Sequence, residues 1–208
     1  NISHEVRTPL QGFTTISEGL VEHWQDFDEK KKLELATMVA SNAQRLSSLM
    51  SNLLDLSKFS ADKMQMDMKE INLDKIVKDI IDESKGLYIN DRNIKIELIS
   101  NFNESIIADP ERIGQVLRNI FANSIKFSPD NSKIIATLEI EDNHCRFSLQ
   151  DAGIGIPENE LQTIFEAFTQ SSLTKTGAGG TGLGLSICKE IIDAHNGKIW
   201  AVNNINNG

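Results

Sequence analysis

The chain has 208 residues, of which 39% are apolar and 25% are charged, a composition typical of a folded protein with one or two domains. Its net charge of -9 argues against nucleic acid or an anionic membrane as the main partner. No apolar run approaches the roughly 20 residues that span a bilayer, and no signal peptide is recognisable. Cys145 and Cys188 match no metal or redox spacing, and two thiols in so long a chain indicate a reducing compartment, with each as a small core residue. We therefore expect a cytoplasmic fragment of a longer chain, which could be anchored in the cell membrane elsewhere.

Residues 1–60 predict two helices joined at the polar break "DFDEKKK", where Asp28 is suited to cap the second helix. A hairpin of two helices cannot bury both of its apolar stripes alone, so it needs a partner. A second copy of the chain would complete a four-helix bundle, and the alternative is packing on the chain's own C-terminal domain. The second helix carries an apolar heptad seam formed by Ala36, Val39, Ala43, Leu46, Met50 and Leu53.

From about residue 71 helices and strands alternate, which indicates an α/β or α+β sandwich. We expect helices over 74–88, over 109–127 with Asp109 as N-cap and Pro110 in the first turn, and over 181–195, which Gly197 is suited to end. The expected strands are "IKIELI", "SKIIATLEI", "CRFSLQ" and "KIWAV", with the middle two forming a hairpin around "EDNH".

The helix that contains "RNIFANSIKF" carries a polar stripe beside its apolar face. Asn119, Asn123 and Lys126 are spaced so that they share one face of this helix. A carboxamide oxygen is a hard ligand suited to Mg²⁺, and a lysine can meet a phosphate. The alternative is an ordinary solvated face.

Two glycine-containing stretches follow. In "DAGIGIP" the glycines allow the backbone to approach a flat ligand, and an ionised Asp151 would accept a hydrogen bond from an adenine amine; the alternative is a plain turn. The stretch "KTGAGGTGLGLS" lacks the lysine of a P-loop. Gly177, Gly179 and Gly182 match G-x-G-x-x-G, but no buried strand precedes them. A lid over phosphates that leads into a helix N-terminus is the preferred interpretation, and a flexible loop is the alternative.

Taken in order, these stretches resemble the ATP-binding fold shared by sensor histidine kinases, gyrase B, Hsp90 and MutL. "NIFANSIKF" is similar to the N box, "DAGIGIP" to the first glycine box, "FEAF" to the F box and "GTGLGL" to the second glycine box. "SHEVRTPL" resembles the H box of histidine kinases. The resemblance implies a dimerisation and histidine phosphotransfer domain at 1–62, a linker at 63–70 and a catalytic ATP-binding domain at 71–208. The closing strand that usually follows in the family is missing.

The resemblance also implies the roles of single residues. Asn119 and Asn123 would serve ATP and Mg²⁺, with Asn123 as the metal ligand, while Lys126 would contact phosphate and Asp151 adenine. Phe165 and Phe168 would anchor the lid. The cleft and lid would be shaped by Gly153, Gly155, Gly180, Thr181, Gly182, Leu183 and Gly184.

The branches of this family differ in the group that attacks the γ-phosphate of ATP. The gyrase and Hsp90 branch activates water with a Glu four positions before the metal-binding Asn, and here that position is Asn119, an amide that cannot accept a proton. His4 supplies another nucleophile, with Glu5 as its general base. Thr8 lies on the same helical face as His4, where phosphatase-competent relatives position a water.

The sequence thus predicts ATP-dependent autophosphorylation of His4. Transfer to an aspartate of a response regulator, which docks near His4, would follow. A gyrase-type ATP clamp and a catalytically silent scaffold are the alternatives.

Overall fold

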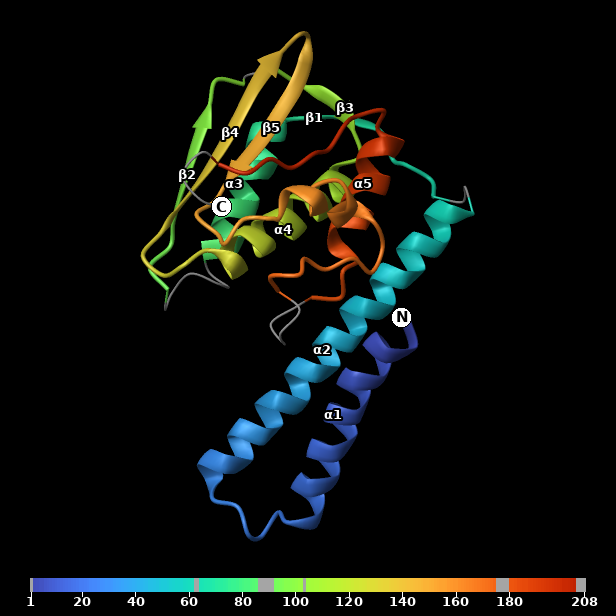
Figure 1. Ribbon diagram of the computed structural model, residues 1–208, viewed down its shortest axis with the longest axis vertical. Coiled ribbons are helices and arrows are strands. Elements are labelled where there is room, and N and C mark those ends of the chain that lie inside the picture. The colour runs from blue at the N-terminus through green and yellow to red at the C-terminus, as the bar shows by residue number, and fades with distance from the viewer. Residues whose placement is uncertain (1, 62–63, 86–91, 103, 175–179, 205–208) are drawn as a thin grey trace. The chain divides into compact units, whose positions relative to one another are not determined.

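The computed structural model describes residues 2–61, 64–85, 92–102, 104–174 and 180–204, with the backbone alone for 2–5 and 60 (Figure 1). The chain divides into two compact units, Asn1–Met64 and Gln65–Gly208. Each unit is described by itself.

The first unit is a hairpin of two long helices, α1 (Ile2–Glu22) and α2 (Glu29–Ser60). Asp28 caps α2, because its side chain accepts a hydrogen bond from the Lys31 backbone N–H at 2.7 Å. The predicted polar break and its cap are therefore confirmed. Pro9 lies inside α1 and is buried, and α1 continues through it.

The predicted heptad seam of α2 divides between two faces of the helix. Val39, Leu46 and Leu53 are half-buried, on the same side as the fully buried Leu49. A second stripe is uncovered in the hairpin and consists of Leu33, Ala36, Ala43, Met50 and Leu54. Leu33 is 70% exposed and Leu54 60% exposed, so one hairpin leaves a row of apolar side chains in water.

The second unit is built on a three-stranded sheet of β2 (Lys95–Ser100), β4 (Lys133–Glu141) and β5 (His144–Gln150), in the order β2-β4-β5. Strands β4 and β5 form the predicted antiparallel hairpin, and β2 pairs with β4 in parallel. Two strands of three residues, β1 (Lys69–Ile71) and β3 (Ile106–Ala108), make a separate antiparallel pair. They were not predicted, because so short a segment shows no periodicity.

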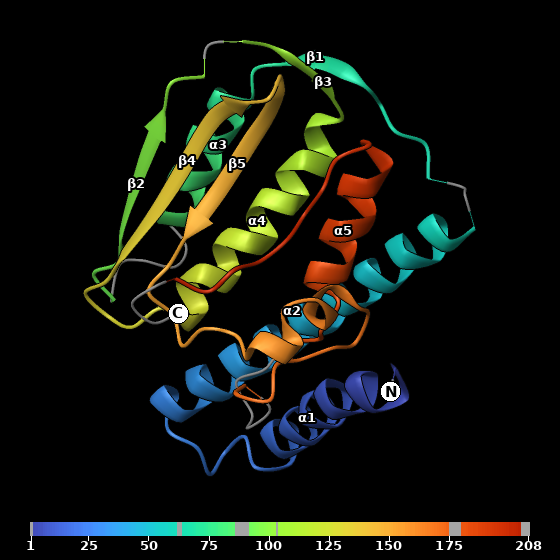
Figure 2. The ribbon, with the colours of Figure 1, turned by 45° about the horizontal axis from the view of Figure 1, so that its top comes forward.

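Three helices complete this unit: α3 (Leu73–Ser84), α4 (Pro110–Phe127) and α5 (Gly184–Ala194). Helices α3 and α4 lie against one face of the sheet, and α5 packs beside α4 (Figure 2). The core between these layers includes Val77, Phe121 and Leu138, each 1% exposed or less. The fold class is thus a helical hairpin followed by an α/β sandwich, as the sequence predicts.

Helix α4 is held at both ends. The Asp109 carboxylate, 5% exposed, accepts hydrogen bonds from the backbone N–H groups of Glu111, Arg112 and Asp67 at 3.0, 3.1 and 2.9 Å. At the other end the Arg92 guanidinium donates to the carbonyl oxygens of Ile125 and Ser128, which end the helix. A positive charge there also interacts favourably with the helix dipole.

One predicted boundary, one predicted capping residue and one predicted strand are wrong. Helix α5 begins at Gly184 and not near Thr181, because Gly182 has a φ of 68° that is incompatible with a right-handed helix. Gly197 is predicted to end this helix, but the residue that adopts the left-handed conformation after α5 is Asn196, with a φ of 58°. The segment "KIWAV" is not a strand in the structure, and Asn203, which follows it, binds the backbone of Ile156 through its side-chain amide. Helix α3 ends at Ser84, and residues 86–88 of its predicted range lie outside the described residues.

Asp109 should contribute to stability in a pH-dependent manner. Burial alone would raise the pKa of Asp109, but its backbone hydrogen bonds outweigh burial and hold the pKa below its usual value. Its contribution is therefore present above the unfolded-state pKa, near 4, and is lost as the pH falls through the lower folded-state pKa.

We expect Asp109→Ala to lower the free energy of unfolding by about 1–2 kcal/mol at pH 7. Asp109→Asn should lower it less, because the amide oxygen can still cap α4. Pulsed hydrogen exchange of the α4 peptide across a urea series measures both. The deficit of Asp109→Asn should shrink below about pH 4, and a deficit independent of pH would contradict the argument.

Candidate functional site

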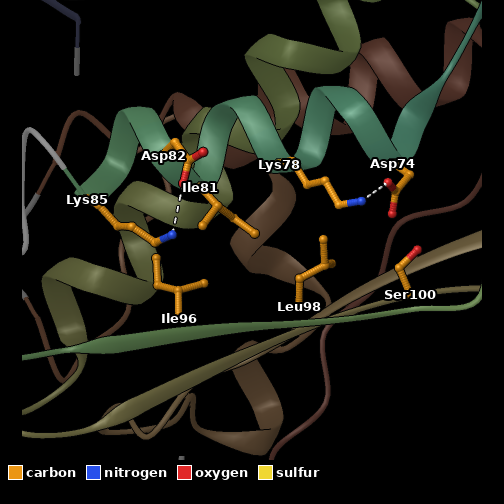
Figure 3. Close-up of a pocket in the computed structure, with 8 residues that line it drawn as sticks. All are labelled: Asp74, Lys78, Ile81, Asp82, Lys85, Ile96, Leu98 and Ser100. Atoms are coloured by element: carbon orange, nitrogen blue, oxygen red, sulfur yellow. Dashed lines mark hydrogen bonds and ion pairs between the residues drawn. The ribbon is translucent and has the colours of Figure 1, made fainter.

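A cavity of about 430 Å³ in the second unit lies between α3 and the edge strand β2 (Figure 3). Ile81, Ile96 and Leu98 point toward one another inside it, and the ion pairs Lys78–Asp74 and Lys85–Asp82 lie along α3. Its remaining lining residue is Ser100. None of the residues predicted to bind ATP lines this cavity, and its cations already have acidic partners. The candidate site therefore lies elsewhere, around α4, where the N box and the glycine boxes are found.

The N box lies on α4, whose opposite face is buried through Leu117 and Phe121. Asn119 and Asn123 are half-buried and Lys126 is exposed. The Asn119 amide donates to the Gly184 carbonyl oxygen at 3.4 Å, which links α4 to the first residue of α5. Within the part of the chain that the structure describes, the Asn123 amide has no hydrogen-bonding partner. An unpaired half-buried amide on this face is available to a ligand.

Asp151 follows β5 and is bound to α4 through its side chain. One carboxylate oxygen accepts from the Gly153 N–H at 2.8 Å, and the other from the Ser124 hydroxyl at 2.9 Å. A Cβ at position 153 would lie 2.8 Å from the Asp151 Oδ1 and 3.3 Å from the Phe127 carbonyl oxygen. Only glycine therefore allows the first glycine box to lie this close to the end of α4.

The loop after Asp151 is also tied to the end of the chain. Asn203 forms two hydrogen bonds with the backbone of Ile156, at 3.0 and 2.7 Å, and the Asn204 amide donates to the Asp151 carbonyl oxygen at 2.9 Å. No sequence motif predicts a role for Ser124, Asn203 or Asn204. A single sequence offers no signal for contacts between segments so far apart.

The F box and the second glycine box meet at one backbone contact. The Phe168 N–H donates to the Gly182 carbonyl oxygen at 2.9 Å, and Phe168 has the unusual φ of 64°. A Cβ on Gly182 would approach the backbone of Phe168 and Thr169 to 2.8 Å. Phe165 is buried, so this end of the F box belongs to the core. A strained φ on an aromatic residue is typical of functional segments.

The second glycine box also approaches the polar face of α4. A Cβ built on Gly180 would lie 4.0 Å from the Lys126 Nζ, so this amine is close to the glycine-rich segment. The Gln170 side chain donates to the Gly180 carbonyl oxygen at 2.6 Å. Gly177 and Gly179, part of the alternative dinucleotide pattern, lie outside the described residues.

The N-terminus of α5 faces the same region. Leu183 is its N-cap residue, and no described side chain caps the first turn. The Leu183 N–H donates to the Thr181 hydroxyl at 3.3 Å, so the N–H groups available to an anion are those of the first turn, which begins at Gly184. Behind them Cys188 is fully buried, and burial raises the pKa of its thiol to about 12, against the opposing effect of its hydrogen bond with Asn119. Cys188 is a packing residue, as predicted.

The H box lies on α1 in the other unit. His4 and Glu5 belong to this helix, and their side chains lie outside the described residues. Thr8 is exposed one helical turn after His4. Where the structure is described, it shows no cluster of three His, Cys, Asp or Glu side chains that could hold a metal. It also shows no helix long and apolar enough to cross a membrane.

The fold and the arrangement around α4 define an ATPase-type α/β domain preceded by a helical hairpin. Residues 108–208 match the family described as histidine kinase-, DNA gyrase B- and HSP90-like ATPase, and residues 1–62 match the His Kinase A (phospho-acceptor) domain. The chain therefore belongs to the sensor histidine kinases and contains their catalytic core.

Individual relatives agree with this family. Sensor histidine kinase WalK of Bacillus subtilis is 33% identical over 97% of this chain, which spans only 33% of that relative. Histidine kinase ThkA, solved in complex with response regulator protein TrrA, is 27% identical with a TM-score of 0.74, covering 99% of this chain and 57% of ThkA. Acinetobacter baumannii histidine kinase AdeS is 22% identical with a TM-score of 0.75, over 92% of this chain and 86% of AdeS, which shows the shared fold.

The contact between the F box and the second glycine box can be tested with a matched pair of glycine substitutions. Gly182→Ala places a Cβ at positive φ against backbone, so it should lower the free energy of unfolding by more than about 2 kcal/mol. In Gly180→Ala the new Cβ meets only the end of the Lys126 side chain. This substitution should change the free energy of unfolding by less than about 0.5 kcal/mol. Urea denaturation measures both, and equal effects would contradict the described geometry.

Proposed function

We propose that this chain binds ATP with Mg²⁺ in its second unit, phosphorylates His4 in its hairpin, and passes the phosphoryl group to an aspartate of a response regulator. The observation that carries the proposal is that both glycine boxes contact the N-box helix α4, while the F box is joined to the second glycine box through the Phe168–Gly182 hydrogen bond. Asn119 contacts Gly184, Ser124 binds Asp151, and Lys126 lies beside Gly180. The core would act in the cytoplasm, where ATP is available, with any membrane anchor in a longer parent chain.

The two ends of ATP would bind to different groups. Asp151 would accept a hydrogen bond from the exocyclic amine of adenine, and the Gly153 N–H, which donates to the same carboxylate, supports a fixed orientation of this acceptor. Lys126 and the uncapped N-terminus of α5 would meet the phosphates. Gly155, Thr181 and the neighbouring glycines would shape the cleft, with Phe165 and Phe168 as anchors of the lid.

The donor set fits Mg²⁺ that arrives with ATP. Asn123 offers one hard carboxamide oxygen, and Mg²⁺ usually takes few protein ligands together with phosphates and water. When bound, the ion would neutralise charge on the phosphates. Asn119 and Lys126 flank Asn123 on the same face of α4.

His4 is the proposed phosphoacceptor. A lone pair of its neutral imidazole would form the P–N bond while the bond between the γ-phosphorus and the bridging oxygen breaks and ADP leaves with the electron pair. Glu5 would take the proton that the imidazole then releases. Asn119 supports phosphoryl transfer to His4 and argues against hydrolysis of ATP. An amide that donates to the Gly184 carbonyl oxygen cannot serve as the base that activates water.

A homodimer is the proposed assembly. The uncovered stripe Leu33, Ala36, Ala43, Met50 and Leu54 on α2 supports a second hairpin as its partner, because two such stripes would bury each other in a four-helix bundle. The ThkA–TrrA complex supports a response regulator as the second partner. The exposed position of Thr8, one turn from His4, supports phosphatase activity toward that regulator.

Labelling with γ-³²P-ATP and Mg²⁺ tests the proposal. The protein should acquire an acid-labile, base-stable label, and His4→Ala should abolish it. His23→Ala is the matched control, because His23 is an exposed histidine in the same hairpin, and it should retain the label.

Other outcomes would identify the alternatives. Steady phosphate release without labelling of the protein would indicate an ATP clamp. Neither labelling nor release would indicate a silent scaffold.

A further inference from the structure

Ser124 makes a buried contact that the proposed chemistry does not yet use. It follows Asn123 directly on α4 and is 7% exposed. Its hydroxyl donates to the Asp151 Oδ2 at 2.9 Å. Because the serine is shielded from water, this hydrogen bond has little competition from solvent.

The Asp151 carboxylate is thereby fixed at both oxygens. The Gly153 N–H donates to Oδ1 at 2.8 Å, and the Asn204 amide holds the Asp151 carbonyl oxygen at 2.9 Å. Rotation of the carboxylate would break the bonds from Ser124 and Gly153 together. The donors on the two oxygens come from α4 and from the loop itself, so the orientation depends on both elements.

We propose that Ser124 is a positioning residue that sets the base specificity of the nucleotide site through Asp151. A hydroxyl carries one proton, and Ser124 uses it on Oδ2. An ionised carboxylate can only accept, and the donors on its two oxygens fix the direction in which its remaining lone pairs point. An amino group on a purine would be bound, and a carbonyl oxygen at the same position would be repelled. This assignment rests on the proposed function, in which Asp151 contacts adenine.

Ser124 also prevents the site from adapting to the wrong base. To meet a carbonyl oxygen, the serine hydroxyl would have to rotate away from Asp151 and leave the Asp151 Oδ2 without this donor. That loss is unfavourable because Ser124 itself is buried. Removal of the hydroxyl should leave the carboxylate oriented by Gly153 alone and reduce the discrimination between bases.

The test compares nucleotide affinities of the intact chain and its variants by isothermal titration calorimetry. The ligands are ATP, purine riboside triphosphate, which lacks the amino group, and inosine triphosphate, which carries a carbonyl oxygen in its place. Ser124→Ala should weaken ATP binding about five- to tenfold and purine riboside triphosphate binding less than about twofold. The preference for ATP over inosine triphosphate should fall by a similar factor. Ser124→Thr, which keeps the hydroxyl, should retain the wild-type preference.

Ser128→Ala is the matched control. Ser128 is a buried serine at the end of the same helix, and its hydroxyl has no partner in the described part of the chain. Its removal should change all three affinities by less than about twofold. Autophosphorylation of Ser124→Ala should show a raised KM for ATP with kcat within about twofold of wild type, whereas a general loss of structure would lower kcat as well.

The outcomes separate this inference from the proposed function. If the wild-type chain prefers ATP over its analogues and Ser124→Ala keeps that preference, Ser124 has no positioning role and the nucleotide site stands. An equal loss for all three ligands in Ser124→Ala would also overturn the assignment. If the wild-type chain does not bind ATP, the proposed function fails and the role of Ser124 fails with it.

Discussion

Helix α4 is the element on which the second unit depends, because charged side chains hold it at both ends. Asp109 binds three backbone N–H groups at its start, one of them from Asp67 ahead of β1, and Arg92 binds two carbonyl oxygens at its end. Burial of Phe121 and Leu117 prevents the helix from rotating, since rotation would carry these side chains out of the core. The polar face with Asn119, Asn123 and Lys126 is thus presented in a fixed direction.

The other parts of the candidate site are positioned by their contacts with this helix. Asp151 is bound through Ser124, Gly153 lies against the Phe127 carbonyl oxygen, and α5 begins against Asn119. A rigid scaffold of this kind suits phosphoryl transfer, in which the protein acts mainly by positioning and by neutralising charge. Pre-organised groups need little rearrangement when the nucleotide binds, so less of the binding free energy is lost.

Much of this organisation could be predicted from the sequence, because it is local. The cap at Asp109, the hairpin of β4 and β5 and the polar stripe of α4 each follow from residues within one segment. The contacts of Ser124, Asn203 and Asn204 could not be predicted, because they join segments whose distance in the chain carries no periodic signal. The start of α5 at Gly184 could not be predicted for a similar reason. The positive φ of Gly182, which precedes the helix, accompanies a tertiary contact with Phe168.

Binding of ATP at the polar face of α4 is tested most directly by NMR, with ¹⁵N-labelled protein titrated with Mg-ATP. Binding there should cause large chemical shift changes at the side-chain amides of Asn119 and Asn123 and at the backbone of Gly153 and Gly184. It should cause small changes along 74–85, where α3 borders the other cavity. Large changes along 74–85 with an unaffected α4 would contradict binding at α4, because ATP would then bind away from every box that identifies the site.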